Sequence, residues 1–221
     1  MKKVCFYILS IVFLISCEKE ENNIPEFSEA SYKVTITGKW QSPQFVVPSG
    51  VHFTTFAGMV HNENAFLWKP GQLASLGVEN VAETGNTTAL FKEIDSIIAK
   101  QNADTAFAIS APSATGTTTG YIYPNSNYSF ISFESMIAPS PDWFVGLNGF
   151  DLYKNNQWIS DTLINLFVYD AGTEEGDVFG YNNPPTSPQQ NIELLTSAKA
   201  TVLANGNSSL APIATVRFTK Q

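Results

Sequence analysis

The sequence predicts an all-β protein, an antiparallel β-sandwich of about eight strands with one or two short helices. From residue 32 onward, apolar and polar residues alternate with a period of two, as they do in strands with one face in water. Short apolar runs then recur along the chain, separated by clusters of Gly, Pro, Asn and Ser. Helical spacing does not alternate regularly with these runs, which argues against a doubly wound parallel sheet.

The strand candidates extend from residue 32 to the C-terminus. Within residues 32–40, Tyr, Val, Ile and Trp alternate with Lys and Thr, so the first strand has an apolar and a polar face. Six further candidates share short length, apolar content and flanking turn residues, and they are Val51 to Val60, Thr105 to Ser110, Tyr128 to Ile137, Trp143 to Leu152, Thr162 to Tyr169 and Ile213 to Thr219. Seven or more short strands favour a sandwich.

Two segments are candidates for short helices. The clearer one has an apolar face with spacing i, i+1, i+4, i+7 and i+8, formed by Leu90, Phe91, Ile94, Ile97 and Ile98. It follows Asn86-Thr87-Thr88, whose side chains are suited to cap a helix N-terminus. A weaker helical turn is expected between Leu73 and Ala82.

The composition indicates one acidic domain with a substantial core. Of the 221 residues, 43% are hydrophobic and 13% are aromatic, which argues against intrinsic disorder. Lys and Arg number 12 against 20 Asp and Glu, giving a formal net charge of -8. Arg217 is the single arginine, so no basic stripe could neutralise phosphates and a nucleic-acid partner is disfavoured. An acidic surface is better suited to cations.

The first residues predict a lipoprotein signal peptide over residues 1–16. Lys2 and Lys3 precede an apolar run of about a dozen residues, which is typical of a signal h-region and too short to span a bilayer. The run ends in Leu14-Ile15-Ser16-Cys17, which resembles the lipobox of bacterial lipoproteins, where Cys17 would receive lipid on its sulfur. The alternative is an ordinary cleaved signal. Because Cys5 lies in the removed segment, no disulfide can form within one mature chain.

Residues 17–30 are expected to form a flexible acidic tether to a domain at residues 31–221. Within this tether, Lys19-Glu20-Glu21 resembles the acidic export signal of some Gram-negative surface lipoproteins, and a plain linker is the alternative. The expected location is the cell envelope, in the outer membrane, with the lipid as the only membrane contact. If the export signal acts, the domain is expected at the cell surface. Without Lys2 and Lys3, 10 basic and 20 acidic side chains remain, a formal charge of about -10.

Motifs for enzyme chemistry are mostly missing from the sequence. It contains no Gly-x-Ser-x-Gly elbow, no P-loop and no Gly-x-Gly-x-x-Gly. The two histidines, His52 and His61, do not have zinc-ligand spacing, and ordinary strand histidines are the favoured interpretation. We therefore predict that the protein is not an enzyme. Carboxylate pairs for glycoside hydrolysis are defined by spatial separation, so a carbohydrate-active hydrolase remains an alternative.

The densest group of acidic residues is Asp170-Ala171-Gly172-Thr173-Glu174-Glu175-Gly176-Asp177. It follows a predicted strand and places four carboxylates in eight residues, with two glycines that allow the backbone to bend. Calcium and other hard divalent ions take several oxygen ligands, which such a loop can supply. The loop is not an EF-hand, because its third position is Gly172 and no helices flank it. A solvated acidic turn is the alternative.

Two motifs of the sequence occur in a fixed order. Pro139-Ser140-Pro141-Asp142-Trp143 is followed downstream by Asp170-Ala171-Gly172-Thr173. This combination resembles the spondin domain, the amino-terminal domain type of F-spondin and mindin. Supporting matches extend over residues 31–221, and they include Tyr32-Lys33-Val34-Thr35, Gly38-Lys39-Trp40, Leu67-Trp68, Gly77-Val78, Val81-Ala82-Glu83, the segment from Pro184 to Gln189, and Leu195-Thr196-Ser197. The order and joint presence of these pieces make the resemblance specific.

The resemblance implies a C2-like β-sandwich that holds calcium or another divalent cation in loops at one end. Carried over residue by residue, the metal ligands fall on Asp142, Asp170 and Glu174. The family commonly has aspartate at the position of Glu174. The longer glutamate keeps the carboxylate but could change denticity or ion preference. Glu134 is an auxiliary candidate if its strand runs beside the loop, although a solvent-facing glutamate is the favoured interpretation. Trp143 is expected to be a buried sandwich tryptophan.

Together these features predict a lipid-anchored, extracytoplasmic recognition or adhesion module with a calcium-type site. The expected partner is an extracellular glycan or a matrix-type protein. The alternatives are the hydrolase named above and a purely structural envelope lipoprotein.

Overall fold

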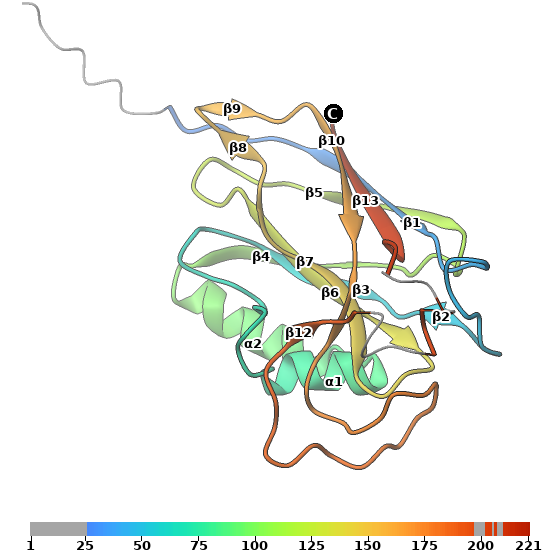
Figure 1. Cartoon of the computed structure of the whole chain (residues 1–221). Coiled ribbons are helices and arrows are strands. Elements are labelled where there is room, and N and C mark those ends of the chain that lie inside the picture. The colour runs from blue at the N-terminus through green and yellow to red at the C-terminus, as the bar shows by residue number, and fades with distance from the viewer. Residues whose placement is uncertain (1–25, 197–201, 205, 207–209) are drawn as a thin grey trace, which may run out of the picture.

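The computed structural model describes residues 26–196, 202–204, 206 and 210–221. Cys17, the signal peptide and most of the predicted tether therefore lie outside the described residues. Two antiparallel β-sheets pack face to face, and two helices cover the outer face of the larger sheet (Figure 1). The predicted all-β sandwich with short helices is confirmed. No helix among the described residues is long and apolar enough to cross a membrane.

The smaller sheet carries the period-two pattern seen in the sequence. Its strand order is β10-β13-β1-β5, with β10 at Asp161–Leu166, β13 at Ala214–Lys220, β1 at Tyr32–Gly38 and β5 at Thr117–Ile122. In β1, Tyr32, Val34 and Ile36 are buried and face the other sheet, while the residues between them are partly exposed. The alternation predicted from the sequence thus sets which face enters the core.

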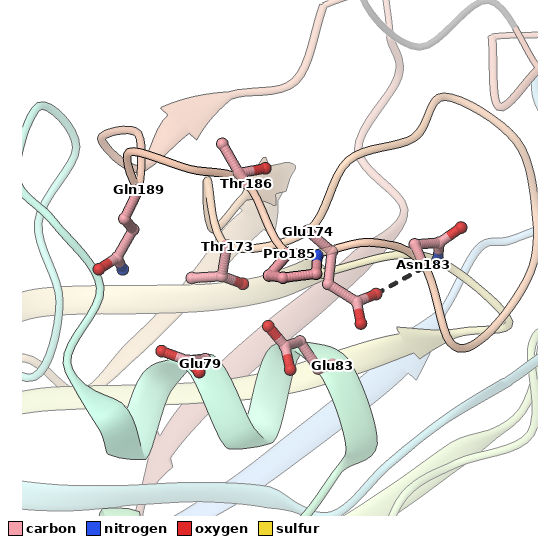
Figure 2. Close-up of a pocket in the computed structure, with 8 residues that line it drawn as sticks. All are labelled: Glu79, Glu83, Thr173, Glu174, Asn183, Pro185, Thr186 and Gln189. Atoms are coloured by element: carbon pink, nitrogen blue, oxygen red, sulfur yellow. Dashed lines mark hydrogen bonds between the residues drawn. The ribbon is translucent and has the colours of Figure 1, made fainter.

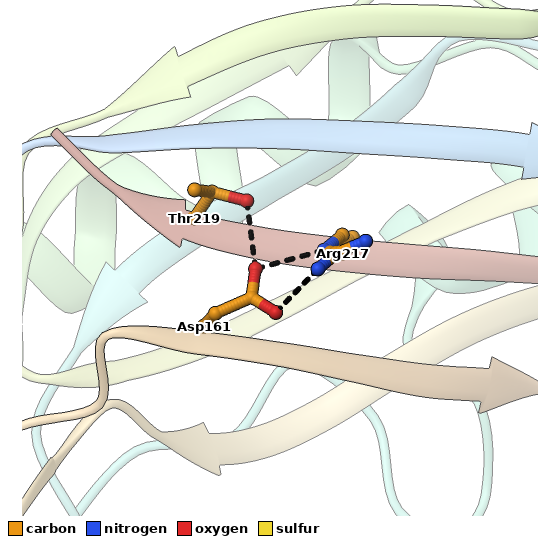
Figure 3. Close-up of polar contacts among 3 residues, drawn as sticks. All are labelled: Asp161, Arg217 and Thr219. Atoms are coloured by element: carbon orange, nitrogen blue, oxygen red, sulfur yellow. Dashed lines mark hydrogen bonds and ion pairs between the residues drawn. The ribbon is translucent and has the colours of Figure 1, made fainter.

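Arg217, the single arginine, forms an ion pair with Asp161 on the outer face of the smaller sheet. Arg217 on β13 donates from Nε to Asp161 Oδ1 at 2.8 Å and from Nη2 to Oδ2 at 2.6 Å (Figure 3). Thr219 Oγ1 also donates to Asp161 Oδ1, at 2.9 Å. This exposed pair links β10 to β13 and adds little to stability, because solvent screens it.

The larger sheet has the order β12-β11-β7-β6-β3-β4, and β2 pairs with one end of β6. Its bounds are Glu193–Leu194 for β12, Val168–Asp170 for β11, Trp143–Asp151 for β7, Phe130–Ala138 for β6, Phe56–His61 for β3, Ala103–Ile109 for β4 and His52–Phe53 for β2. A separate hairpin pairs β8 (Tyr153–Lys154) with β9 (Gln157–Trp158). Eight of the described strands have six or more residues, which matches the expected number.

The two helices are α1 (Leu76–Thr84) and α2 (Thr88–Ala99), and hydrogen bonds connect them at the N-terminus of α1. Ser75 caps α1 and accepts from the Val78 amide at 3.3 Å. Glu93 on α2 reaches across and accepts from the Gly77 amide at 2.8 Å and from Ser75 Oγ at 2.6 Å. A Cβ on Gly77 would lie 2.7 Å from the Cα of Leu90, so glycine is required for the helices to approach this closely.

Two hydrophobic cores result from this layering. The core between the sheets contains large side chains from both of them, including Phe56, Phe133, Trp143 and Phe218, together with Trp40 from the segment after β1. The core between the larger sheet and the helices contains Met59, Trp68, Val78, Leu90 and Phe144. Trp143 is buried between the sheets, as the sequence predicted.

The structure differs from the sequence prediction in several places, and β5 is a strand that was not predicted. The run from Thr162 to Tyr169 is two strands, β10 and β11, which belong to different sheets because the chain crosses between them near Phe167. The run from Val51 to Val60 is likewise divided into β2 and β3. The predicted tether also packs at its end, because the Ser28 amide donates to Ser126 Oγ at 3.1 Å and Ala30 is buried.

Candidate functional site

The two motifs singled out in the sequence meet at one end of the larger sheet. The turn containing Asp142 connects β6 to β7, and the acidic loop begins where β11 ends. Because β11 pairs with β7, Asp170 lies opposite Trp143, and the Ala171 amide donates to the Asp142 carbonyl at 3.1 Å. The pairing of β7 with β11 therefore brings together residues that are 28 positions apart.

Asp142 is the most constrained acid of this site. Its side chain is fully buried, and Oδ2 accepts from the Thr173 amide at 2.7 Å and from the Glu174 amide at 3.1 Å. Burial raises the pKa of Asp142, although these hydrogen bonds act in the opposite direction. The other oxygen, Oδ1, is also buried and has no hydrogen-bond partner among the described residues. Asp142 thus anchors the acidic loop and leaves one oxygen unsatisfied.

The other two predicted ligands are only partly buried. Asp170 Oδ1 accepts from the Gly172 amide at 2.8 Å, within a turn in which Gly172 has φ of +73°. Glu174 Oε2 accepts from Asn183 Nδ2 at 3.2 Å. Burial raises the pKa of Glu174, and the nearby charge of Asp142 raises it further.

Two cavities flank Glu174. The first, which we call the helix cavity, has a volume of about 280 Å³ and lies between α1 and the loop at 173–189 (Figure 2). Its lining residues are Glu79, Glu83, Thr173, Glu174, Asn183, Pro185, Thr186 and Gln189. The second, which we call the loop cavity, has a volume of about 360 Å³ and includes Asp170, Glu174, Glu175 and Asp177 in its lining. Glu174 is therefore part of the wall that both cavities share.

The predicted ligand set is only partly assembled. Within the described part of the chain, no three His, Cys, Asp or Glu side chains are placed to hold one metal ion. Asp142 and Glu174 are joined through the Glu174 amide, whereas the Glu174 carboxylate points toward Asn183 and α1 (Figure 2). The feature that fits a cation is the buried, unpartnered Oδ1 of Asp142, since an oxygen of this kind is an appropriate ligand for a hard ion.

Sequence analysis missed the contribution of helix α1. Glu83 lines the helix cavity. Burial raises the pKa of Glu83, and a hydrogen bond with the Thr173 side chain lowers it. The charges of Glu174, Glu79 and Asp142 raise this pKa further. The spacing of Glu79 and Glu83 places them on one helix face, which was available as a signal. The loop that this face meets begins about 90 residues later, and no local pattern identifies it.

The predicted exposure of Glu134 is wrong. It was expected to face solvent, but it is fully buried beneath the helix layer, where β6 pairs with β3 and β7. Neither carboxylate oxygen has a hydrogen-bond partner among the described residues. Burial raises the pKa of Glu134 well above its ordinary value, and the charge of Glu93 adds to this effect.

His61 and Ser132 resemble a catalytic pair in spacing but lie in the core. His61 Nε2 is 2.8 Å from Ser132 Oγ, and the Nδ1 atom of His61 is 2.7 Å from the carbonyl oxygen of Asn62. Both side chains are fully buried, so a substrate in solvent does not reach them. Burial lowers the pKa of His61, which favours the neutral imidazole.

Comparison with known proteins identifies the family. The Spondin_N family model matches residues 30–206. The chain belongs to the spondin family. The spondin domain here is 34% identical to spondin-2 of Rattus norvegicus and of Homo sapiens, over 86% of this chain and 62% and 61% of those proteins. It is 32% identical to spondin-1 of Gallus gallus over 76% of this chain and 22% of that protein. The chain thus spans about three fifths of the spondin-2 relatives and about a fifth of spondin-1.

Proposed function

We propose that this spondin domain is an extracytoplasmic recognition module whose loop end holds a divalent cation, with calcium the best candidate. The ligands would be Asp142, Asp170 and Glu174. The observation that carries the proposal is the fully buried carboxylate of Asp142, which has one oxygen held by loop amides and the other without a partner among the described residues.

The surrounding groups favour a cation over a neutral ligand. Burial raises the pKa of Glu174, hydrogen bonds with Asn183 lower it, and the charge of Asp142 raises it. A positive ion would relieve the repulsion between Glu174 and Asp142. All the candidate ligands are carboxylates, the oxygen donors that calcium prefers. A cation here would compete with Asn183 for the Glu174 carboxylate and would fix the acidic loop against β7.

The recognised partner would be an extracellular glycan or a matrix-type protein. A cation held by carboxylates can leave one coordination position for a carboxylate or sulfate oxygen of the partner. Such a bridge would allow a domain with a formal charge of about -10 to bind an acidic ligand that it would otherwise repel.

Binding should depend on the divalent ion and on Asp170. On an array of glycans and matrix proteins, the wild-type chain should bind its partner in calcium and lose that binding in chelator. Asp170→Asn should reduce binding at least about tenfold, a loss of about 1.4 kcal/mol. The matched control is Asp151→Asn, because Asp151 lies at the other end of β7. Binding that persists in chelator and in Asp170→Asn would place the recognition surface elsewhere.

Membrane attachment should require the sulfur of Cys17. Lipidation forms a thioether, so Cys17→Ser should leave the chain as unprocessed precursor or release it from membranes. Stable anchoring needs more than one lipid chain, as in a bacterial lipoprotein, so the wild-type chain should remain in the membrane pellet. Fractionation and mass spectrometry of the N-terminus measure both outcomes. Unchanged fractionation and mass of the variant would exclude the lipid anchor.

A further inference from the structure

Exposed aromatic side chains gather at the end of the sandwich that lies away from the acidic loop. Phe27 is 57% exposed, Tyr121 is 53% exposed and Tyr123 is 65% exposed. Phe27 precedes β1, and the two tyrosines lie where β5 ends beside the start of β1. We call this the N-terminal end, and it is formed by residues 26–33, 121–129, 151–161 and 217–221.

The first described residues are held firmly at the N-terminal end. The Ser28 carbonyl accepts from the Ser126 amide at 2.8 Å, and Ser28 Oγ accepts from Trp158 Nε1 at 2.9 Å. The Ala30 amide donates to the Pro124 carbonyl at 3.0 Å. The chain therefore leaves the folded domain at Phe27, between the loop after β5 and the β8–β9 hairpin, and not at residue 31.

The length of chain between this exit and the proposed lipid limits how the domain can be oriented. Nine peptide steps connect Cys17 to Glu26, and they span at most about 30 Å when fully extended. β7 also has nine residues and is about 30 Å long, and it runs from the acidic loop at Trp143 to the N-terminal end at Asp151 (Figure 1). The acidic loop could thus reach the membrane only if the connection were fully extended along the domain.

The distribution of charge favours the same orientation. The segments of the N-terminal end carry equal numbers of acidic and basic side chains, which are Glu26, Glu29, Asp151, Asp161, Lys33, Lys154, Arg217 and Lys220. Residues 170–193 carry five acidic side chains and no lysine or arginine. An anionic lipid surface repels the second group and does not repel the first. Val178 and Tyr181 are exposed within the acidic segment, but its charge opposes contact with such a surface.

The exposed residues of the N-terminal end are of the type that lies at membrane–water interfaces. Tyrosine has an apolar ring and a polar hydroxyl, and it is enriched at the level of the lipid headgroups. Two or three such rings bind a bilayer only weakly by themselves. A lipid on the same chain would keep them at high effective concentration next to the membrane, so a weak contact is sufficient.

We propose that the N-terminal end is a membrane-facing surface, on which Phe27, Tyr121 and Tyr123 lie in the lipid headgroup region. This inference rests on the lipid anchor of the proposed function and does not require the divalent ion. The contact would hold the sandwich upright, with the acidic loop pointing away from the membrane and accessible to a partner.

The test is hydrogen exchange of the mature chain from Cys17, which contains every described residue and has Cys17 as its single cysteine. The sulfur is coupled to a maleimide lipid in vesicles of phosphatidylethanolamine and phosphatidylglycerol, so the result does not depend on lipidation in the cell. The reference is the same chain coupled to a soluble maleimide. Amides of residues 121–128 and 153–159 should exchange at least about threefold more slowly on vesicles, and those of residues 173–189 should be unchanged.

Substitution of the aromatic residues should abolish this protection. Phe27→Ser combined with Tyr123→Ser should remove at least about half of the slowing, and an unchanged melting temperature would show that the fold is intact. The matched control is Tyr181→Ser, because Tyr181 is also 53% exposed but lies in the acidic segment. This control and the conservative variant Tyr123→Phe should keep the full slowing.

Three results would overturn the inference. These are equal exchange in the two couplings, slower exchange of residues 173–189 in place of the N-terminal end, and equal effects of Tyr181→Ser and the double variant. Failure of the lipid anchor is a separate result, because it is measured by fractionation of Cys17→Ser and leaves the vesicle experiment unchanged. A chain that is lipidated in cells but shows no slowing on vesicles refutes only the membrane-facing surface.

Discussion

Replacing Glu134 with methionine should raise the free energy of unfolding by about 2 kcal/mol at neutral pH. Glu134 is fully buried, and both its oxygens lack hydrogen-bond partners among the described residues. Burial of an unsatisfied polar group costs about 1–3 kcal/mol in proteins, and methionine has a similar unbranched shape without that cost. For a chain of this size the melting temperature should rise by about 4–8 °C, which differential scanning calorimetry measures.

The same residue should make stability depend on pH, and Glu134→Gln isolates this effect. Because the pKa of Glu134 is raised above its ordinary value of 4.5, the folded state favours the neutral acid. The unfolded chain releases this proton more readily, so stability should fall as the pH rises from about 4.5 through the folded pKa. Glutamine keeps the shape but does not ionise, so the variant should lose less stability over this interval.

The exposed Glu63 provides the matched control for these substitutions. Glu63→Gln makes the same chemical change at an exposed position, and it should leave the melting temperature close to that of the wild type. Comparison of the variants with the wild type also subtracts the contribution that His61 makes in both, whose lowered pKa acts in the opposite direction. Parallel pH profiles for the wild type and Glu134→Gln would contradict the prediction that Glu134 makes stability depend on pH.

The predictability of the fold follows from side-chain patterns. The first strand and α2 were predicted because one face of each is apolar, and the structure buries those faces. β5 was missed because its residues are mostly Thr and Gly, and its inward-facing Gly120 packs against Ile109 instead of presenting an apolar side chain. The division of residues 162–169 into β10 and β11 was also missed. The apolar run continues through the point where the chain passes from one sheet to the other, so the sequence shows no break there.

The site was predictable only where its residues are close in sequence or belong to a family motif. The acidic loop and Asp142 were found in this way, and β7 and β11 bring them together. Glu83 was not found, because its role depends on α1 packing beneath a loop that is distant in sequence. Glu134 was placed on the wrong side, because a single acidic residue within a strand gives no sign that a helix layer covers its face.

Asp142→Ala should lower the free energy of unfolding by about 3 kcal/mol in the presence of chelator. The substitution leaves the amides of Thr173 and Glu174 without their acceptor, and Thr173 is only 5% exposed. Each buried, unsatisfied amide costs about 1–3 kcal/mol, and removal of the unpartnered Oδ1 offsets part of that loss. The melting temperature should fall by about 6–12 °C. Asp151→Ala is the matched control for the change of melting temperature in calcium. Asp151 Oδ1 accepts hydrogen bonds from Ser129 Oγ and the Tyr153 amide at the opposite end of β7.

Asp142→Asn separates the anchoring role of this residue from its proposed role as a metal ligand. The amide keeps a carbonyl oxygen for the Thr173 and Glu174 amides, so the loss of stability in chelator should be smaller than in Asp142→Ala. Calcium at 100 times its Kd adds about 2.7 kcal/mol if it binds only the folded state. It should therefore raise the melting temperature of the wild type and of Asp151→Ala by about 5–10 °C, and that of Asp142→Asn by much less. A full calcium shift in Asp142→Asn would refute the ligand role. An Asp142→Ala chain as stable as the wild type in chelator would refute the anchoring role, because the loop amides would then need no acceptor from the turn between β6 and β7.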